Sequence, residues 1–250
     1  MRNIYLPPFK AAVESGVTTF MSGFHELNGV PTSANPYLLQ DVLRKEWGFE
    51  GFVVSDWASV REVAAHGHAR NLKEAGERAF NAGVDMDMES VAYLNHMKEL
   101  VAEGKVSEEA IDNSVRKILR MKYAVGIMDD PYRYCSEKRE KEVILNKKFV
   151  ALAKEAACKS MVLLKNENNL LPLSEKTGSI AIIGPLADSK ADMMGSWSKS
   201  GDPNDAVTFW ETMQKKYGKK IDLVYEKGCD INSDSREGFA AALDLSLIHI

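Results

Sequence analysis

Hydrophobic and polar positions in the first part of the chain alternate between short apolar runs and helical stripes. Residues 17–23 form a β-branched run, and a second run over 51–56, GFVVSD, ends in a carboxylate. Between these runs, Asn35 suits an N-cap and Pro36 the first position of a helix that ends at Gly48. The apolar residues of that helix recur at helical spacing, at Leu38, Leu39, Val42, Leu43 and Trp47.

The same alternation continues to about residue 120. A helix is predicted over 71–82 and ends at Gly83, and a third short strand is predicted over 84–88. Two further helices follow, the second capped by Ser107, with an inner face predicted at Ile111, Val115, Ile118 and Leu119. Strands separated by helices at this spacing predict parallel pairing with right-handed crossovers, so the expected fold class is α/β.

A second pattern follows a break at residues 129–142, where DDPYRYCSEKREKE replaces periodicity with Pro, aromatic residues and charges. The segments predicted after it are helices over 146–159 and 205–217 and strands over 160–166, 179–184 and 221–228. The expected organisation is a first domain over 1–128, a linker over 129–145 and a second domain over 146–250.

The number of strands in the first domain is too small for a complete fold. Three parallel strands cannot bury both faces of a sheet, and a closed barrel of this type needs eight strands and about 250 residues. The apolar tail from about residue 243 has no cap or turn, and we interpret it as non-native. The chain is therefore expected to be an internal piece of a larger protein.

Composition and charge narrow the classes of partner. The chain is 45% hydrophobic and 27% charged, which is typical of a globular protein, and its net charge is −4. No basic excess favours nucleic acid or an anionic membrane. No apolar run of 18 residues and no signal-peptide pattern occur, so a small polar partner is favoured.

Cysteine and histidine spacing gives no framework for a disulfide or a metal. Cys135, Cys158 and Cys229 are odd in number and far apart, and we expect free thiols. His66 and His68 supply two potential ligands without a third, which indicates a surface loop rather than a zinc site.

Asp56 and Trp57 stand directly after the second predicted strand. In parallel α/β folds the loops at the carboxyl ends of the strands build the functional cleft. Asp56 could equally cap the following helix. Trp57 favours a sugar site, because an indole packs on the apolar C–H face of a pyranose while carboxylates bind its hydroxyls. A packed loop aromatic is the alternative for Trp57.

Several motifs carry a resemblance to a known family. GFVVSDW, preceded by VPTSANPYLLQDVLRKEWGFE and followed in order by NAGVDMDM, KNENNLLPL and IAIIGPLAD, resembles the glycoside hydrolase family 3 β-glucosidases, in particular the bacterial periplasmic type. The resemblance runs from about Tyr5 to about Ala242. It implies the C-terminal part of a (β/α)8 TIM-like barrel followed by the first part of an α/β sandwich domain. It also implies a periplasmic or secreted parent protein that uses no metal or organic cofactor.

The resemblance assigns roles to individual residues. Asp56 matches the catalytic nucleophile of a retaining glycosidase, which forms a covalent glycosyl-enzyme. Trp57 and Phe24 match positions that line the sugar site, whereas His25 stands where relatives usually carry Asn. Two further candidates carry an alternative: Met21 contacts substrate or packs in the core, and Trp197 in GSWSKSG helps to close the cleft or lies in an ordinary surface loop.

Asp85 and Asp87 are a second pair of strand-end carboxylates. Residues two apart in a strand point to the same side, which suggests an acid/base pair. The matching family motif, G-x-D-x-x-M ending at Met88, is however a structural element of the closing strand. The acid/base Glu and the family's other sugar-binding residues are expected outside residues 1–250.

The implied activity of the parent protein is removal of non-reducing β-D-glucosyl residues from β-linked oligosaccharides. A β-xylosidase, a β-N-acetylglucosaminidase and a non-catalytic carbohydrate-binding module are the alternatives. The isolated chain is expected to be inactive, because general acid/base catalysis and most substrate contacts would be missing.

Overall fold

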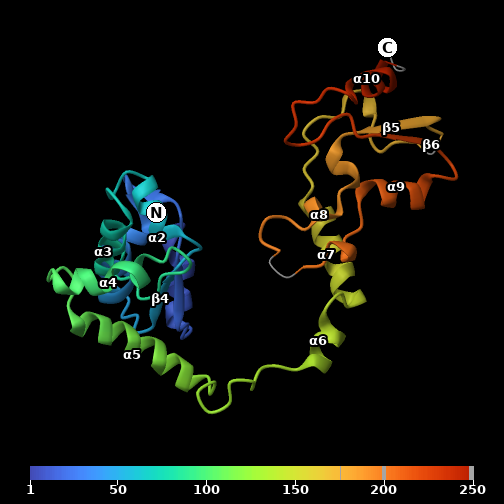
Figure 1. The fold of residues 1–250 in the computed structure, drawn as a ribbon. Coiled ribbons are helices and arrows are strands. Elements are labelled where there is room, and N and C mark those ends of the chain that lie inside the picture. Colours follow the sequence, from blue (N-terminus) through green and yellow to red (C-terminus); the bar gives the residue numbers. More distant parts are fainter. Residues whose placement is uncertain (175, 199–200, 248–250) are drawn as a thin grey trace. The chain divides into compact units, whose positions relative to one another are not determined.

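A computed structural model of the chain describes residues 1–174, 176–198 and 201–247. It divides into two compact units, Met1–Ile144 and Leu145–Ile250 (Figure 1). Each unit has helices and its own pair of parallel strands, β1–β4 in the first unit and β5–β6 in the second. The fold is therefore mixed α/β, as predicted.

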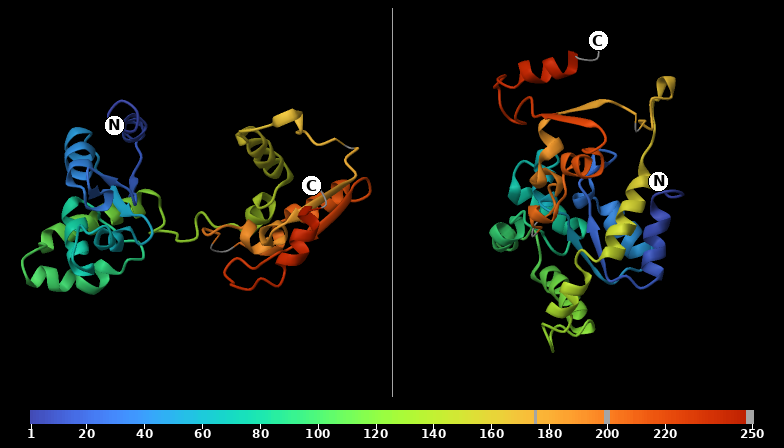
Figure 2. Two further views of the ribbon diagram at one scale, coloured as in Figure 1. Left: turned by 90° about the horizontal axis from the view of Figure 1, so that it is seen from above. Right: turned by 90° about the vertical axis from the view of Figure 1, so that its right-hand side faces the viewer.

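The first unit begins with a helix and then alternates strands and helices. Its elements are α1 (Leu6–Glu14), β1 (Thr19–Ser22), β2 (Glu26–Leu27), β3 (Val30–Pro31), the 3₁₀ helix η1 (Thr32–Ala34), the π-helix η2 (Tyr37–Glu46), β4 (Phe52–Ser55), α2 (Ser59–Ala65), α3 (Leu72–Ala82), α4 (Ala92–Ala102), α5 (Glu108–Ala124) and α6 (Glu137–Val143). Helix α3 packs between α2 and α4 (Figure 2). Both α2 and α3 also contact η1.

Helix boundaries in the first unit follow the predicted caps. The side chain of Asn35 accepts a hydrogen bond from the N–H of Leu38. Ser107, the other predicted cap, does the same for α5. Asn71 caps α3 as well, although no cap was predicted there. Gly83 ends α3 with φ 114°, a left-handed conformation that costs other residues energy.

Strands β1 and β4 pair in parallel, with Thr19 opposite Phe52 and Ser22 opposite Ser55. The third predicted strand, 84–88, is reduced to a single bridge between Val54 and Met86. The Asp85 side chain accounts for this loss, because its Oδ2 accepts the N–H of Val53 at 2.9 Å. That N–H is therefore not available to a backbone ladder.

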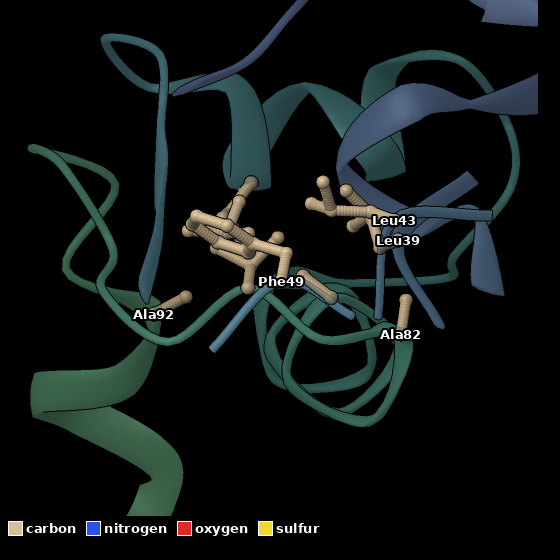
Figure 3. Packing of buried hydrophobic residues seen from close by; sticks show 9 residues of the cluster. Leu39, Leu43, Phe49, Ala82 and Ala92 are labelled. Atoms are coloured by element: carbon tan, nitrogen blue, oxygen red, sulfur yellow. The ribbon is translucent and has the colours of Figure 1, made fainter. Parts of the chain in front are cut away.

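The main core of the first unit lies between η2, β4, α3 and α4. Figure 3 shows Leu39 and Leu43 from η2 meeting Phe49, with Ala82 and Ala92 from the two helices. Val53 of β4 is fully buried in the same cluster. Burial of this apolar surface contributes a favourable free energy of about 25 cal/mol per Å² and stabilises the position of β4.

Helix α5 turns only part of its predicted apolar face inward, with Ile111 and Ile118 half-buried. Val115 and Leu119 are 47% and 39% exposed, and the buried residue of α5 is Ser114. The reason is electrostatic: Ser114 and Lys117 both donate hydrogen bonds to the buried Asp85 carboxylate, at 2.8 and 2.7 Å. Ile111 alone of the predicted set packs beside the cluster of Phe80, Leu100 and Val106.

The second unit contains the remaining elements. They are α7 (Lys147–Ser160), η3 (Glu167–Asn169), β5 (Ser179–Ile183), η4 (Pro185–Asp188), α8 (Lys190–Met193), η5 (Pro203–Asp205), α9 (Phe209–Tyr217), β6 (Asp222–Glu226) and α10 (Phe239–Leu247). Strands β5 and β6 pair in parallel, with Ile180 opposite Leu223. Thr208 begins α9 with a reciprocal capping box formed with Glu211.

The predicted strand over 160–166 is wrong for this structure. Ser160 ends α7, and residues 161–166 pair with no strand among the described residues. Leu164 is 91% exposed. An apolar, β-prone sequence forms a strand only when a neighbour accepts its hydrogen bonds. The predicted non-native tail begins inside α10, and its last residues, 248–250, lie outside the described residues.

Cys135 and Cys158 are exposed free thiols, and Cys229 is a half-buried one. Nδ1 of His66 lies 2.7 Å from Oε1 of Glu26, so the partner of His66 is Glu26 rather than His68. Within the described residues no group of three or more His, Cys, Asp or Glu is placed to hold a metal ion. None of the described helices is long and apolar enough to cross a membrane.

Candidate active site

The turn that follows β4 carries Asp56. Its backbone N–H donates a 3.0 Å hydrogen bond to the carbonyl of Ser22, at the end of the neighbouring strand β1. Its carbonyl accepts from the Ser55 hydroxyl at 3.0 Å and from the Ser59 N–H at 3.1 Å. The peptide groups of Asp56 are thus held on both sides, and its backbone is a fixed point at the rim of the strand pair.

The two oxygens of the Asp56 carboxylate differ in their surroundings. Oδ1 accepts the backbone N–H of Trp57 at 2.6 Å. Oδ2 accepts no hydrogen bond from any of the described residues, and the side chain is only partly buried. One oxygen therefore orients the carboxylate while the other keeps its lone pairs available for a ligand.

The residues after Asp56 form a strained turn into α2. Ala58 adopts a left-handed conformation with φ 60°, and its N–H donates to the carbonyl of Met88 at 2.9 Å. Ser55 binds the same loop, because its hydroxyl accepts the Met88 N–H at 2.7 Å. These two contacts fasten the Asp56 turn to residues 86–88. Trp57, at the tip of the turn, is 38% exposed.

The other candidates from the first unit follow β1. Met21 lies opposite Val54 in the strand register and is 52% exposed. Phe24 and His25 come after Gly23, whose carbonyl accepts the Thr32 hydroxyl at 2.5 Å. The structure therefore brings Met21 and the Phe24–His25 loop to the same strand ends as Asp56 and Trp57. Trp197 belongs to the second unit, where it is 64% exposed; residues 199–200 of its loop lie outside the described residues.

An apolar groove of the first unit shares Met21 and His25 with this rim. It has a volume of about 480 Å³ and is lined mainly by apolar side chains of α1, β1 and η2, together with Met21 and His25. Asp56 and Trp57 do not line it. A pyranose needs convergent polar groups for its hydroxyls, so we interpret the groove as a packing surface and the Asp56 rim as the candidate site.

Asp85 and Asp87 have separate structural tasks. The Asp85 carboxylate accepts from Arg44, Lys117, Ser114 and the Val53 N–H. Asp87 Oδ2 accepts the N–H groups of Ala92 and Tyr93 at the start of α4. Burial, with the nearby Asp87 and Asp85 carboxylates, raises the pKa of the Tyr93 phenol well above its ordinary value of 10.0.

The hydroxyls that support the Asp56 turn were not predicted from the sequence. Ser22, Ser33, Ser55 and Ser59 are each less than 5% exposed, and each makes a hydrogen bond near the turn. A partial signal exists, because Ser22 and Ser55 end apolar runs at matching positions. Ser33 and Ser59 have no such pattern.

Two family models match the chain. The glycosyl hydrolase family 3 N terminal domain matches residues 1–121, and the glycosyl hydrolase family 3 C-terminal domain matches residues 161–248. Both models come from one family and occur in the expected order, which agrees with the division of the chain into two units.

Curated relatives and solved structures are similar to nearly the whole of this chain. A periplasmic β-glucosidase of Salmonella typhimurium is 40% identical over 93% of this chain and 31% of its own length. A β-xylosidase of Formosa agariphila is 40% identical over 97% of this chain and 35% of its own length. A β-glucosidase of Listeria innocua in complex with isofagomine superposes with a TM-score of 0.71 at 34% identity, covering 99% of this chain and 34% of that structure. The chain thus spans about a third of the length of these relatives.

Proposed function

Because the chain belongs to glycoside hydrolase family 3, we propose that the intact protein is a retaining, exo-acting β-glycosidase with Asp56 as its nucleophile. The observation that carries this proposal is the Asp56 carboxylate, with Oδ1 anchored on the Trp57 N–H and Oδ2 unengaged by the described residues. A nucleophile needs this combination of fixed orientation and available lone pairs.

The reaction proceeds in two displacements. Asp56 Oδ2 forms a bond to the anomeric carbon while the glycosidic C–O bond breaks, its electron pair passing to the leaving oxygen, which a second carboxyl group protonates. Water then attacks the same carbon from the opposite side and gives its proton to that group, which frees Asp56. The two carboxyl groups must lie about 5 to 5.5 Å apart in a retaining enzyme.

We place the acid/base carboxyl outside residues 1–250. Asp85 accepts hydrogen bonds from Arg44, Lys117, Ser114 and the Val53 backbone, so both of its carboxylate oxygens are already engaged within the fold. Asp87 uses Oδ2 to cap α4. Residues 1–250 alone are therefore expected to be inactive.

The substrate class is a β-linked oligosaccharide or glucoside cleaved at its non-reducing end. Trp57 offers a partly exposed indole for the sugar face, and Phe24, His25 and Met21 supply the opposite rim. Trp197 is the fifth candidate contact, from the second unit. The β-D-glucosyl residue is the first choice and β-D-xylosyl the second, since the matched relatives are named for both activities.

The architecture proposed for the parent protein matches this assignment. Residues 1–128 would form the C-terminal part of a (β/α)8 barrel, 129–145 a linker and 146–250 the first part of an α/β sandwich. The parallel pairing of β1 with β4, which are connected through η2, supports the proposal of a barrel. The parallel pairing of β5 with β6 supports the proposal of a sandwich. A periplasmic or secreted location is proposed from the name of the Salmonella relative.

Covalent trapping tests the proposal. The intact protein is incubated with a 2-deoxy-2-fluoro-β-glucosyl fluoride, which transfers its fluorosugar to the nucleophile and releases fluoride. Peptide mass spectrometry is expected to find the label on Asp56. Asp56→Asn should abolish both labelling and turnover, while Asp41→Asn, an exposed carboxylate paired with Lys45, should keep both. Labelling of another residue would refute the assignment.

A carbohydrate-binding module is the other outcome of the same experiment. Such a protein would bind glucose or a β-glucoside before and after Asp56→Asn with equal affinity, and it would neither turn over substrate nor acquire a label. Equilibrium binding measured on both proteins separates this case from an enzyme.

A further inference from the structure

A buried chain of three serine hydroxyls runs beneath the Asp56 turn. Ser22 and Ser33 share a hydrogen bond of 2.8 Å between their Oγ atoms, and Ser33 and Ser59 share another of 2.8 Å. The three residues come from β1, η1 and α2, and they are 4%, 1% and 2% exposed. Buried hydroxyl chains are costly unless every member is paired, and Ser33 pairs with both of the others.

This chain closes a ring around the backbone of Asp56. Its N–H donates to the carbonyl of Ser22, and its carbonyl accepts from the N–H of Ser59. The side chains of those same two serines are joined only through Ser33. The Ser33 hydroxyl therefore links the end of β1 to the start of α2.

The segment that carries Ser33 also holds the opposite rim. Thr32 donates its hydroxyl to the Gly23 carbonyl at 2.5 Å and its N–H to the His25 carbonyl at 3.0 Å. One three-residue element thus contacts both the turn with the nucleophile and the loop with the proposed sugar contacts. These residues lie in the VPTSANP stretch, where the sequence pattern singles out Asn35 and Pro36 but neither Thr32 nor Ser33.

We propose that Ser33 is a positioning residue that aligns the Asp56 carboxylate with a sugar bound over the end of β1. This inference rests on the proposed function. The Asp56 carboxylate moves with its turn, because Oδ1 is tied to the next N–H. A shift of the turn relative to the Gly23–His25 loop therefore displaces Oδ2 from the anomeric carbon. Misplacement by about 1 Å costs on the order of 100-fold in rate.

Ser33→Ala in the intact enzyme tests this role. The rate of covalent trapping by the fluorosugar and kcat are both expected to fall roughly 10- to 100-fold, because the attack step is misaligned. KM should change less than about threefold, since ground-state contacts to the sugar remain. Ser33→Thr, which returns the hydroxyl, is expected to recover most of the trapping rate.

The matched control is Ser114→Ala, which removes another buried hydroxyl with a 2.8 Å bond, in α5 and outside the ring. It should lower stability while leaving the trapping rate within about twofold. Ser59→Ala breaks one hydrogen bond of the same chain of serine hydroxyls. The double variant that combines it with Ser33→Ala should therefore lose no more of the trapping rate than the single variant with the larger loss. Additive losses would contradict a shared chain.

The outcomes separate the two proposals. If the wild-type enzyme is labelled at Asp56 and Ser33→Ala traps at the wild-type rate, the positioning role is overturned and the proposed function stands. If Ser114→Ala slows trapping as much as Ser33→Ala does, the effect is one of stability and the role is likewise overturned. Absence of a label on Asp56 in the wild type overturns the proposed function itself.

Discussion

The guanidinium of Arg44 and the carboxylate of Asp85 form a 2.6 Å ion pair in the interior of the first unit, with the Asp85 side chain only 3% exposed. Lys117 reaches the other oxygen of the same carboxylate at 2.7 Å. Arg44 also donates to the carbonyl of Gly51, next to β4. A single carboxylate thus joins η2, the β4 strand and α5 below the candidate site.

Asp85→Asn is expected to destabilise the first unit by about 3–5 kcal/mol, because Arg44 and Lys117 would lose the buried counter-charge that they share. Urea unfolding followed by hydrogen exchange of peptides from β4 measures this loss. Asp41→Asn removes an exposed ion pair with Lys45 and should cost less than about 1 kcal/mol. Equal losses in the two variants would contradict a structural role for Asp85.

Gly51→Ala is expected to break the contact between β1 and β4. An added Cβ would lie 2.1 Å from the Thr18 carbonyl oxygen and 2.6 Å from the Phe49 ring. Because the first obstacle is backbone, relief requires the strands to separate, at a cost of about 3 kcal/mol or more. Thermal melting by circular dichroism should show the loss. Gly104→Ala, where nothing lies within 4 Å, isolates the smaller effect of a positive φ.

Val91→Asn is expected to raise stability by about 1 kcal/mol. Val91 holds a left-handed conformation with φ 54° immediately before α4, which is unfavourable for a β-branched residue, and Asp87 rather than Val91 caps the helix. Asn tolerates this conformation better than Val does. Differential scanning calorimetry is the direct measurement. Leu94→Asn, an exposed change within the same helix, should instead lower the melting temperature slightly.

Acid should weaken the first unit through two carboxyl groups. Hydrogen bonds from Arg70 and Arg78 lower the pKa of Glu74 to about 2, and those from Lys73 and Lys105 lower the pKa of Glu103 to about 2. A lowered folded-state pKa gives stability that is present above the unfolded value of about 4.3 and is lost as pH falls toward 2.

The free energy of unfolding, measured by urea titration, should therefore decline from about pH 4.5 to pH 2. Glu74→Gln should flatten part of this slope, and 1 M NaCl should reduce it because salt screens these partly exposed ion pairs. A slope that Glu74→Gln leaves unchanged would contradict the role of Glu74.

Local features of this protein were readable from the sequence alone. Asn35 and Ser107 cap their helices, and β1, β4, β5 and β6 fall where apolar runs predicted strands. Asp56 was correctly expected at the carboxyl end of a strand. Each of these depends on neighbours within a few residues, so a contiguous pattern contains the information.

The tertiary structure decided the rest, because the deciding partners are far apart in the chain. Asp85 takes hydrogen bonds from residues 41 and 32 positions away, and this turns Ser114 rather than Val115 inward and interrupts the third strand. Residues 161–166 have a strand-like sequence but find no partner strand among the described residues. The hydroxyl chain through Ser33 arises only once β1, η1 and α2 meet. A serine in sequence is merely polar, whereas three serines brought together in a dry interior must bond to one another.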